Sequence, residues 1–200
     1  VQKSALYMIK GDAQNSIVYI EKLIGIDRLS ASAISYGKDV LLSTPKNGTL
    51  ITHGFDDTYS VWYAQKHLGI RTDVTLVSMD FMQSDFYRNE LERKGYQLPS
   101  SIIVDVKFFN AFCSLNKTKG ISASMTLPKE YLTGMLSNLY VTGLVFEYHI
   151  ESFSNFSRND ELWRNKLNKE LVNHANDEKG KQLSSNYLPM LLQLRKVYQE

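Results

Sequence analysis

The feature that most constrains the fold is a strand–loop–helix–strand unit between Gly48 and Ser78. Residues 49–52 (TLIT) are rich in β-branched side chains, which is typical of a short strand. A helix is expected over residues 58–68, with Gly69 as its stop, and a second strand over residues 73–79. A helix of this length between two short strands predicts a βαβ unit with parallel strands and a right-handed crossover.

Further elements extend this alternation along the chain. The spacing of apolar residues and the positions of Pro and Gly predict helices over residues 13–24, 29–43, 84–94, 128–137, 160–175 and 187–198. The same patterns predict strands over residues 102–106, 121–127 and 143–150. Residues 107–120 are ambiguous, and residues 176–185 are typical of a polar linker. We therefore expect an α/β fold with a mostly parallel sheet, flanking helices in Rossmann-like layers, and extra helices at both termini.

The expected organisation has three parts. Residues 1–27 form an N-terminal helical segment, residues 28–150 form the α/β core domain, and residues 151–200 form a C-terminal helical extension packed on the core. A chain of 200 residues with 43% hydrophobic content is long enough to bury one sizeable core.

Composition narrows the possible partners and cofactors. The net charge is +2, from 23 basic and 21 acidic residues, and no run of Lys or Arg exceeds two, so nucleic acid is not an expected partner. No stretch of about 20 apolar residues exists, so no membrane span is expected in this chain. The single cysteine, Cys113, allows no intramolecular disulfide and is expected to be a small buried residue. Because glycine-rich nucleotide motifs and HExxH are lacking, no cofactor and no metal are expected.

Polar side chains follow the first two predicted strands. His53, Asp56 and Asp57 come after the first strand, and Ser78 and Asp80 come at the end of the second. Ligands bind beyond the carboxyl ends of parallel strands, so these residues are the candidate site. Asp56 and Asp57 could bind a divalent cation, orient a sugar hydroxyl, or act as a general base with His53.

A structural role competes with each of these functional roles. An Asp just before a helix is usually a cap that satisfies free backbone N–H groups, and this interpretation suits Asp57 better than Asp56. A histidine at the end of a strand is more often structural than catalytic. Trp62 is expected in the core, whereas Tyr59 and Tyr63 are the aromatic residues near the loop that could line a cleft.

The stretch THGFDDTYSVWYAQKHLGIRTDVTLVSMDFMQSDFYRNEL, Thr52 to Leu91, resembles a known family. That family is the soluble C-terminal part of multi-pass membrane proteins common in Bacteroidetes, of unknown function or described as protein O-mannosyltransferase-like. The matching residues are Gly54, Asp57, Thr58, Trp62, Tyr63, Gln65, Gly69, Arg71, Asp73, Val74 and Tyr87. With looser flanks, the resemblance covers residues 28–150.

The chain also departs from the family pattern in the loop. Phe55 stands where the family has its first acidic residue, Asp56 stands where it has Asn, and Ser60 replaces a Pro. In membrane glycosyltransferases of this type the catalytic residues lie on loops of the membrane region, which this chain lacks. The resemblance therefore implies an accessory domain rather than the transferase, in the periplasm or cell envelope of a bacterium, with the cytoplasm as the other option.

Three functions remain open on the residues alone. The first is a noncatalytic accessory or binding domain linked to glycosylation, whose partner is a glycan or an envelope protein. The second is a hydrolase or transferase that uses His53, Asp56 and Asp57, with or without a divalent metal. The third is an interaction protein that docks a partner on its terminal helices. We rank the first ahead of the second, and whether the chain is an enzyme stays open.

Overall fold

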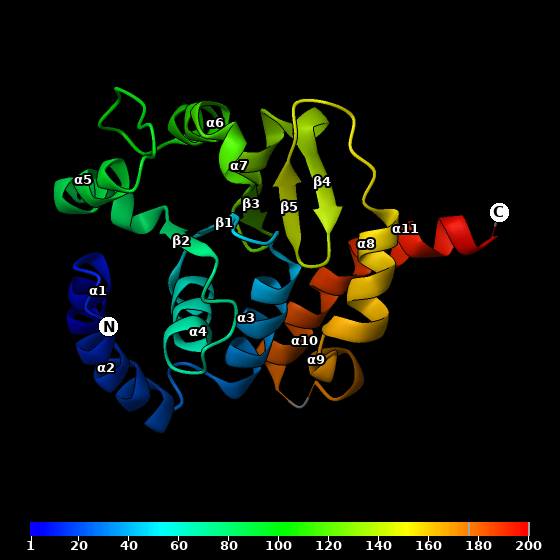
Figure 1. Cartoon of the computed structure of the whole chain (residues 1–200). Coiled ribbons are helices and arrows are strands. Elements are labelled where there is room, and N and C mark those ends of the chain that lie inside the picture. Colours follow the sequence, from blue (N-terminus) through cyan, green and yellow to red (C-terminus); the bar gives the residue numbers. More distant parts are fainter. Residues whose placement is uncertain (176, 200) are drawn as a thin grey trace.

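The computed structural model describes residues 1–175 and 177–199, which form one five-stranded sheet surrounded by helices (Figure 1). The strand order is β2-β1-β3-β5-β4, and the strands are β1 (Thr49–Thr52), β2 (Thr75–Ser78), β3 (Ile121–Ser124), β4 (Leu139–Thr142) and β5 (Val145–Tyr148). β1 is parallel to β2 and β3, whereas β5 is antiparallel to β3 and β4. The α/β class is confirmed, but the prediction of a mostly parallel, Rossmann-like sheet is wrong because the sheet is mixed.

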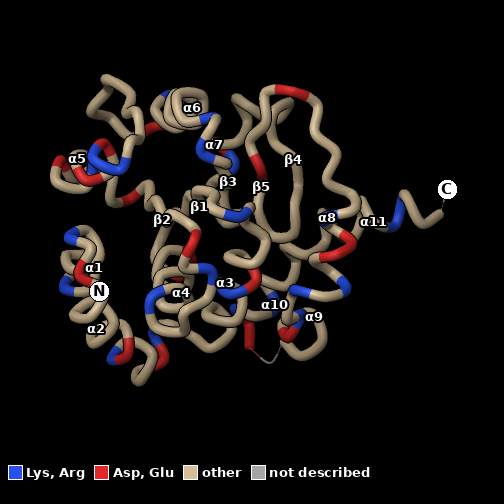
Figure 2. Tube along the Cα trace, viewed as in Figure 1, with Lys and Arg blue, Asp and Glu red and all other residues tan. Residues whose placement is uncertain are grey.

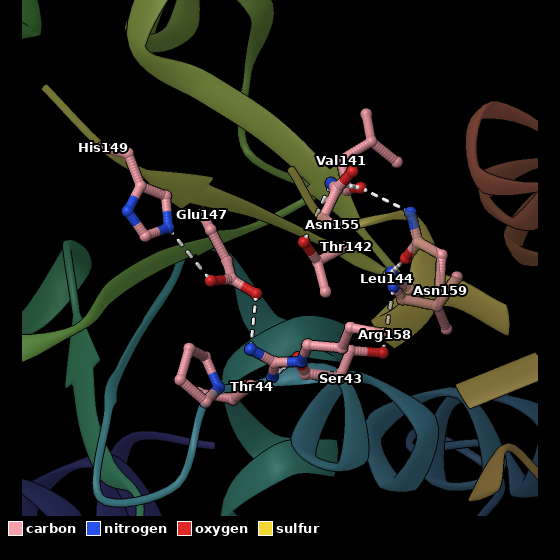
Figure 3. Close-up of polar contacts among 12 residues, drawn as sticks. Ser43, Thr44, Val141, Thr142, Leu144, Glu147, His149, Asn155, Arg158 and Asn159 are labelled. Carbon is pink, nitrogen blue, oxygen red and sulfur yellow. Dashed lines mark hydrogen bonds and ion pairs between the residues drawn. The ribbon is translucent and has the colours of Figure 1, made fainter. Parts of the chain in front are cut away.

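The antiparallel half of the sheet arises from a tight turn inside the apolar stretch 139–150. Gly143 and Leu144 connect β4 to β5, and Gly143 has φ +57°, as glycine often does at the first central position of a hairpin turn. The Asn159 side chain accepts the Gly143 N–H at 2.8 Å, and the Ser43 hydroxyl accepts the Leu144 N–H at 3.0 Å (Figure 3). A two-residue turn can join only antiparallel strands, so this hairpin determines the mixed sheet.

The predicted βαβ unit is present, with parallel strands. Its helix α4 (Phe55–Lys66) begins three residues earlier than the sequence suggested, so Asp56 and Asp57 lie in its first turn. Gly54 is the residue before the helix and has φ +80°. That backbone conformation is open to glycine and strained for other residues, which allows the chain to turn sharply from β1 into the helix.

Helices cover both faces of the sheet. In Figure 1, α3 and α4 lie on one side of the sheet, and α6 and α7 lie on the other. The α-helices besides α4 are α1 (Gln2–Ile9), α2 (Ala13–Gly25), α3 (Ala31–Ser43), α5 (Asp85–Arg93), α6 (Val106–Leu115), α7 (Lys129–Thr133), α8 (Phe156–Glu161), α9 (Glu170–Asn173), α10 (Glu178–Ser184) and α11 (Leu188–Gln199). Short 3₁₀ turns occupy Asp80–Gln83, Lys117–Lys119, Leu136–Asn138 and Ser185–Tyr187, and a π turn occupies Leu162–Lys166.

The predicted strand 102–106 is wrong. These residues form an irregular loop in which Ile102 and Ile103 are 80% and 66% exposed. The Asp105 carboxylate accepts the Phe108 N–H at 2.9 Å and so caps α6, which begins at Val106. The apolar run resembled a strand, but a helix cap at its end competes with an extended conformation.

The single helix predicted over residues 160–175 is also wrong. The chain passes from α8 through the π turn, then bends at Lys169, which has φ +60°, before α9. The predicted linker 176–185 begins at Asn176, which lies outside the described residues, and most of the remainder is helix α10. Asp177 starts that helix by accepting the Gly180 N–H at 2.5 Å.

The C-terminal region contacts α3 through a buried carboxylate. Asp39 is 1% exposed and accepts the backbone N–H groups of Asn168 and Lys169 at 2.8 and 3.2 Å. The Tyr187 hydroxyl donates to the same carboxylate at 2.6 Å. These bonds attach two C-terminal segments to α3, while the division of the chain at residues 27 and 150 stays a prediction.

The C-terminal end of α3 is enclosed by two guanidinium groups. Arg71 donates to the carbonyl oxygens of Leu41, Thr44 and Pro45 at 2.8–3.1 Å and pairs with Asp73 at 2.8 Å. Arg158 donates to the Ser43 carbonyl at 2.8 Å. The last carbonyl groups of a helix have no intrahelical partner, so the two arginines satisfy acceptors that would otherwise need water.

Arg158 also forms a buried ion pair (Figure 3). Its guanidinium lies 2.8 Å from the Glu147 carboxylate, whose side chain is 3% exposed, and His149 lies 3.2 Å from the other carboxylate oxygen. Glu147 belongs to the central part of β5, so this pair connects the sheet to α8 and α3. Elsewhere, basic and acidic residues alternate along the chain without a large region of one sign, as Figure 2 shows.

Aromatic side chains of α6 lie in the core, whereas Trp62, which was expected there, is only partly buried. Phe108, Phe109 and Phe112 on α6 are at most 1% exposed, and Cys113 beside them is buried as predicted. Trp62 is partly buried and its indole N–H donates to Ser16 at 2.9 Å. This bond connects the N-terminal helix pair to α4.

Candidate functional site

A cavity of about 270 Å³ lies at the carboxyl ends of β1 and β3. The loops that leave these two strands diverge, since β1 leads to α4 on one side of the sheet and β3 leads to α7 on the other. Such a divergence leaves a crevice in which α/β proteins commonly bind ligands. The lining residues are Ala33, Tyr36, His53, Gly54, Phe55, Asp56, Asp57, Thr126, Lys179 and Leu183.

Asp57 lies at the base of this cavity and is 5% exposed. One carboxylate oxygen accepts the His53 backbone N–H at 3.0 Å, and the other accepts the Ser124 hydroxyl at 2.8 Å. Burial raises the pKa of Asp57 to about 6, and the hydrogen bonds from His53 and Ser124 oppose that rise. The carboxylate therefore joins the β1 loop to the end of β3. It is not the cap that the sequence suggested, because Gly54 precedes α4 and no side chain caps that helix.

Asp56 lies at the mouth of the cavity and pairs with Lys179 of α10. The Lys179 ammonium donates to one carboxylate oxygen at 2.7 Å, and the two side chains are 41% and 31% exposed. Among residues 1–175 and 177–199, no other side-chain contact reaches this carboxylate or this ammonium group. The pair therefore retains hydrogen-bonding capacity on both sides.

His53 lines the cavity and is contacted from outside it by Asp80. The His53 Nε2 atom lies 3.5 Å from one Asp80 oxygen, and the other Asp80 oxygen accepts the Gly54 N–H at 2.6 Å. The His53 ring also lies 5.8 Å from the Tyr131 ring, centroid to centroid. Asp80 thus holds the loop after β1 to the end of β2 and does not itself line the cavity.

Besides Asp80, three predicted ligand-binding residues do not line the cavity. Tyr59 is 4% exposed and its hydroxyl donates to the Val1 carbonyl at 3.0 Å. Tyr63 stacks on His67 on another face of α4, with ring centroids 4.7 Å apart. Ser78 is 3% exposed, and its backbone N–H donates to the Tyr87 hydroxyl at 3.0 Å. The structure thus brings together His53, Asp56 and Asp57 but not Tyr59, Tyr63 or Ser78.

Sequence reasoning missed the residues that close the cavity from other elements. Tyr36 comes from α3, Thr126 follows β3, and Lys179 and Leu183 come from α10. The Tyr36 hydroxyl accepts a hydrogen bond from the Asn186 side chain at 3.0 Å, and burial raises its pKa. No local pattern points to Lys179, because it is 123 positions from Asp56 in the chain.

Most residues of the family-like motif have structural roles. The Gln65 amide donates to the carbonyls of Arg71 and Val74 at 2.9 and 2.8 Å, and Asp73 accepts the Asn47 N–H at 2.8 Å. The Tyr87 hydroxyl contacts the backbone of β2 at its outer edge. These bonds hold the turn before β2 and cover an edge strand that would otherwise be open to pairing.

The described residues contain neither a membrane-crossing helix nor a metal-binding cluster. None of their helices is long and apolar enough to cross a bilayer. No three His, Cys, Asp or Glu side chains among residues 1–175 and 177–199 lie close enough to hold a metal ion.

Fold and site define a mixed α/β domain with a polar cavity at the carboxyl ends of its parallel strands. Residues 33–110 match the family model described as TMEM260-associated domain 2, and TMEM260 is a protein O-mannosyltransferase-like family. The match covers less than half of the chain, from α3 into α6, and includes the loop from His53 to Asp57. No match was found among curated proteins or among solved structures.

Proposed function

We propose that this chain is a noncatalytic accessory domain of a glycosylation system and that it binds a glycan or an acceptor polypeptide in the cavity between α3, α4 and α10. The match of residues 33–110 to a domain associated with an O-mannosyltransferase-like family supports the link to glycosylation. The resemblance of residues 52–91 supports a bacterial envelope location as a further part of the proposal, which fractionation of the source cells would test.

The cavity itself is the observation that carries the proposal. Its acidic side chains already have protein partners, since Asp57 accepts two hydrogen bonds and Asp56 pairs with Lys179. A binding site needs fixed polar groups around a hollow, and these partners hold both carboxylates in place. This arrangement favours recognition over proton transfer.

A second candidate function rests on Asp57. A carboxyl group whose pKa is raised to about 6 is suited to act as a general acid or base near neutral pH, so a hydrolase or transferase is the alternative. Its hydrogen bonds to His53 and Ser124 would then orient the carboxylate rather than only join two loops. Hydrolysis of a panel of nitrophenyl glycosides, abolished in Asp57→Asn, would favour this alternative.

A cavity-filling variant tests the binding proposal. Ala33 lines the cavity and is 1% exposed, so Ala33→Leu adds side-chain volume inside it. Ala31 lies two residues earlier on the same helix and is exposed, which makes Ala31→Leu a matched control. Both variants and the unmodified chain are applied to arrays of glycans, glycopeptides and unmodified peptides.

We expect at least one ligand to be retained by the unmodified chain and by Ala31→Leu but lost by Ala33→Leu. Thermal unfolding of all three proteins verifies that the cavity variant is folded at the temperature of the assay. Equal retention by Ala33→Leu and Ala31→Leu, or no retained ligand at all, would contradict the proposal.

A further inference from the structure

We infer that the ligand of this cavity is a single uncharged sugar ring, and that two neighbouring hydroxyl groups of the ring bridge Asp56 and Lys179. The inference rests on the proposed binding function and specifies its ligand. It makes Lys179, on a helix outside the matched region 33–110, the residue that determines specificity.

The free hydrogen-bonding capacity of the pair indicates hydroxyl groups. Lys179 uses one N–H on Asp56, which leaves two donors on the ammonium and a free oxygen on the carboxylate. A hydroxyl group can accept from the ammonium while it donates to the carboxylate. Two adjacent hydroxyl groups on a ring can therefore engage both charged partners at once, through hydrogen bonds that are stronger than those between neutral groups.

The charges around the cavity favour an uncharged ligand. Lys179 and Asp56 compensate each other at 2.7 Å, and Asp57 adds a negative group at the base. A phosphate or carboxylate ligand would meet two carboxylates against one ammonium, and the lining contains no arginine. An amino group at Asp56 would share that carboxylate with the Lys179 ammonium, so it would gain less than at an unpaired carboxylate.

Size and lining limit the ligand to one ring inside the cavity. The volume of about 270 Å³ is just below the range of roughly 300–1,000 Å³ for typical small-molecule sites. Ala33, Phe55 and Leu183 supply apolar surface against which the C–H groups of a sugar ring can pack. Tyr36 and Thr126 are further polar residues that line the cavity.

Titrations monitored by NMR, with methyl glycosides of glucose, galactose and mannose as probes, test the inference on the full chain. Glucuronic acid and glucosamine glycosides serve as charged comparisons, and deoxy analogues remove one hydroxyl of each pair. We expect Asp56→Asn and Lys179→Met each to weaken binding of a neutral glycoside by about tenfold or more, because each removes a charged hydrogen-bond partner.

Matched controls come from similar positions outside the cavity. Asp85→Asn removes an exposed carboxylate from the first turn of α5, and Lys181→Met removes an exposed ammonium from α10. We expect both to bind as the unmodified chain does. The deoxy analogues do not depend on any variant being folded, and we expect them to lose binding to a similar degree.

The outcomes separate this inference from the proposed function. Binding of charged glycosides alone, or undiminished binding by Lys179→Met and by the deoxy analogues, would overturn the uncharged sugar and leave a binding domain. Absence of binding to every glycoside, together with equal behaviour of Ala33→Leu and Ala31→Leu on the arrays, would overturn both.

Discussion

The two ends of α3 use the same chemistry for different purposes. At the C-terminal end, Arg71 and Arg158 donate to backbone carbonyls and pair with Asp73 and Glu147. Toward the N-terminal end, the polar groups around Ala33 and Tyr36 surround a cavity. The C-terminal part of the chain supplies one cation to each end, Arg158 to the first and Lys179 to the second.

The difference lies in how completely the charged groups are satisfied. The guanidinium groups at the C-terminal end are bonded on several sides, and Glu147 is almost entirely buried. The Asp56–Lys179 pair is partly exposed and keeps free donors and acceptors. We therefore expect the first region to stabilise the fold and the second to bind a ligand, and stability measurements can separate the two.

The largest effect is expected from Glu147→Gln. Removing this carboxylate leaves Arg158 without its buried counter-charge, and breaking such a pair costs several kcal/mol; because Arg158 is 29% exposed, we expect a loss of about 3 kcal/mol in the free energy of unfolding. Urea denaturation measures it. The control is Glu161→Gln, since Glu161 pairs with Lys166 at the surface at 3.6 Å. Similar losses in the two variants would contradict a special role for the buried pair.

The next largest effect is expected from Arg71→Lys. Lysine retains the charge but cannot satisfy three carbonyl groups and Asp73 with one ammonium, so we expect a loss of about 2 kcal/mol in the free energy of unfolding. Denaturation in urea at high and low salt provides the measurement. Arg93 is 71% exposed, and Arg93→Lys should leave stability unchanged. If Arg71→Lys left the free energy of unfolding unchanged, a positive charge alone would be sufficient at the C-terminal end of α3.

A pH-dependent effect is expected at Asp57. Because burial raises the pKa of Asp57 from 3.8 to about 6, the folded chain holds this proton more tightly than the unfolded chain. Its contribution to stability is therefore fully present below pH 3.8 and is lost as the pH rises to about 6, by about 3 kcal/mol. Asp57→Asn removes the titration, so the unmodified chain should lose stability relative to the variant across this interval.

Denaturation of both proteins at a series of pH values gives the difference directly. Comparing the two proteins cancels other groups, including Asp39, whose pKa is also raised by burial. A difference that stays constant between pH 4 and 7 would mean that Asp57 is not the titrating group.

The smallest effect on stability is expected from Asp56→Asn and Lys179→Met. The pair is partly exposed, so each variant should change the free energy of unfolding by less than about 1 kcal/mol. Differential scanning calorimetry at two salt concentrations measures it. A loss as large as that of Glu147→Gln would mean that this pair holds α10 to the core and would remove the contrast between the two ends of α3.

The parts of the fold that were predictable depend on short-range patterns. The β-branched run Thr49–Thr52, the helix after it and Gly69 were sufficient to predict the parallel unit of β1, α4 and β2. The hairpin of β4 and β5 was not predicted, because the apolar run that Gly143 interrupts is also compatible with one long buried strand. The strand predicted at Ile102–Ile103 is absent. An apolar stretch forms a strand only where a neighbouring strand pairs with it, and these two residues are exposed instead.

The candidate site was likewise predictable only where its residues are close together in the sequence. Residues His53, Asp56 and Asp57 follow β1 directly, and the rule that ligands bind beyond parallel strands located the loop. The aromatic candidates Tyr59 and Tyr63 were chosen by proximity in sequence, but successive helical residues point in different directions, so neither reaches the cavity.

The sequence by itself determined the strand, the acidic loop after it and the helix that follows, because backbone conformation and capping depend on residues a few positions apart. The tertiary structure decided which side chains meet that loop. Ser124 joins Asp57 across 67 positions and Lys179 joins Asp56 across 123, and contacts of such separation depend on how the helices and strands pack rather than on any local pattern. The tertiary structure therefore places the acidic loop in the wall of a cavity and brings Lys179 to Asp56, a pair that keeps free hydrogen-bonding groups.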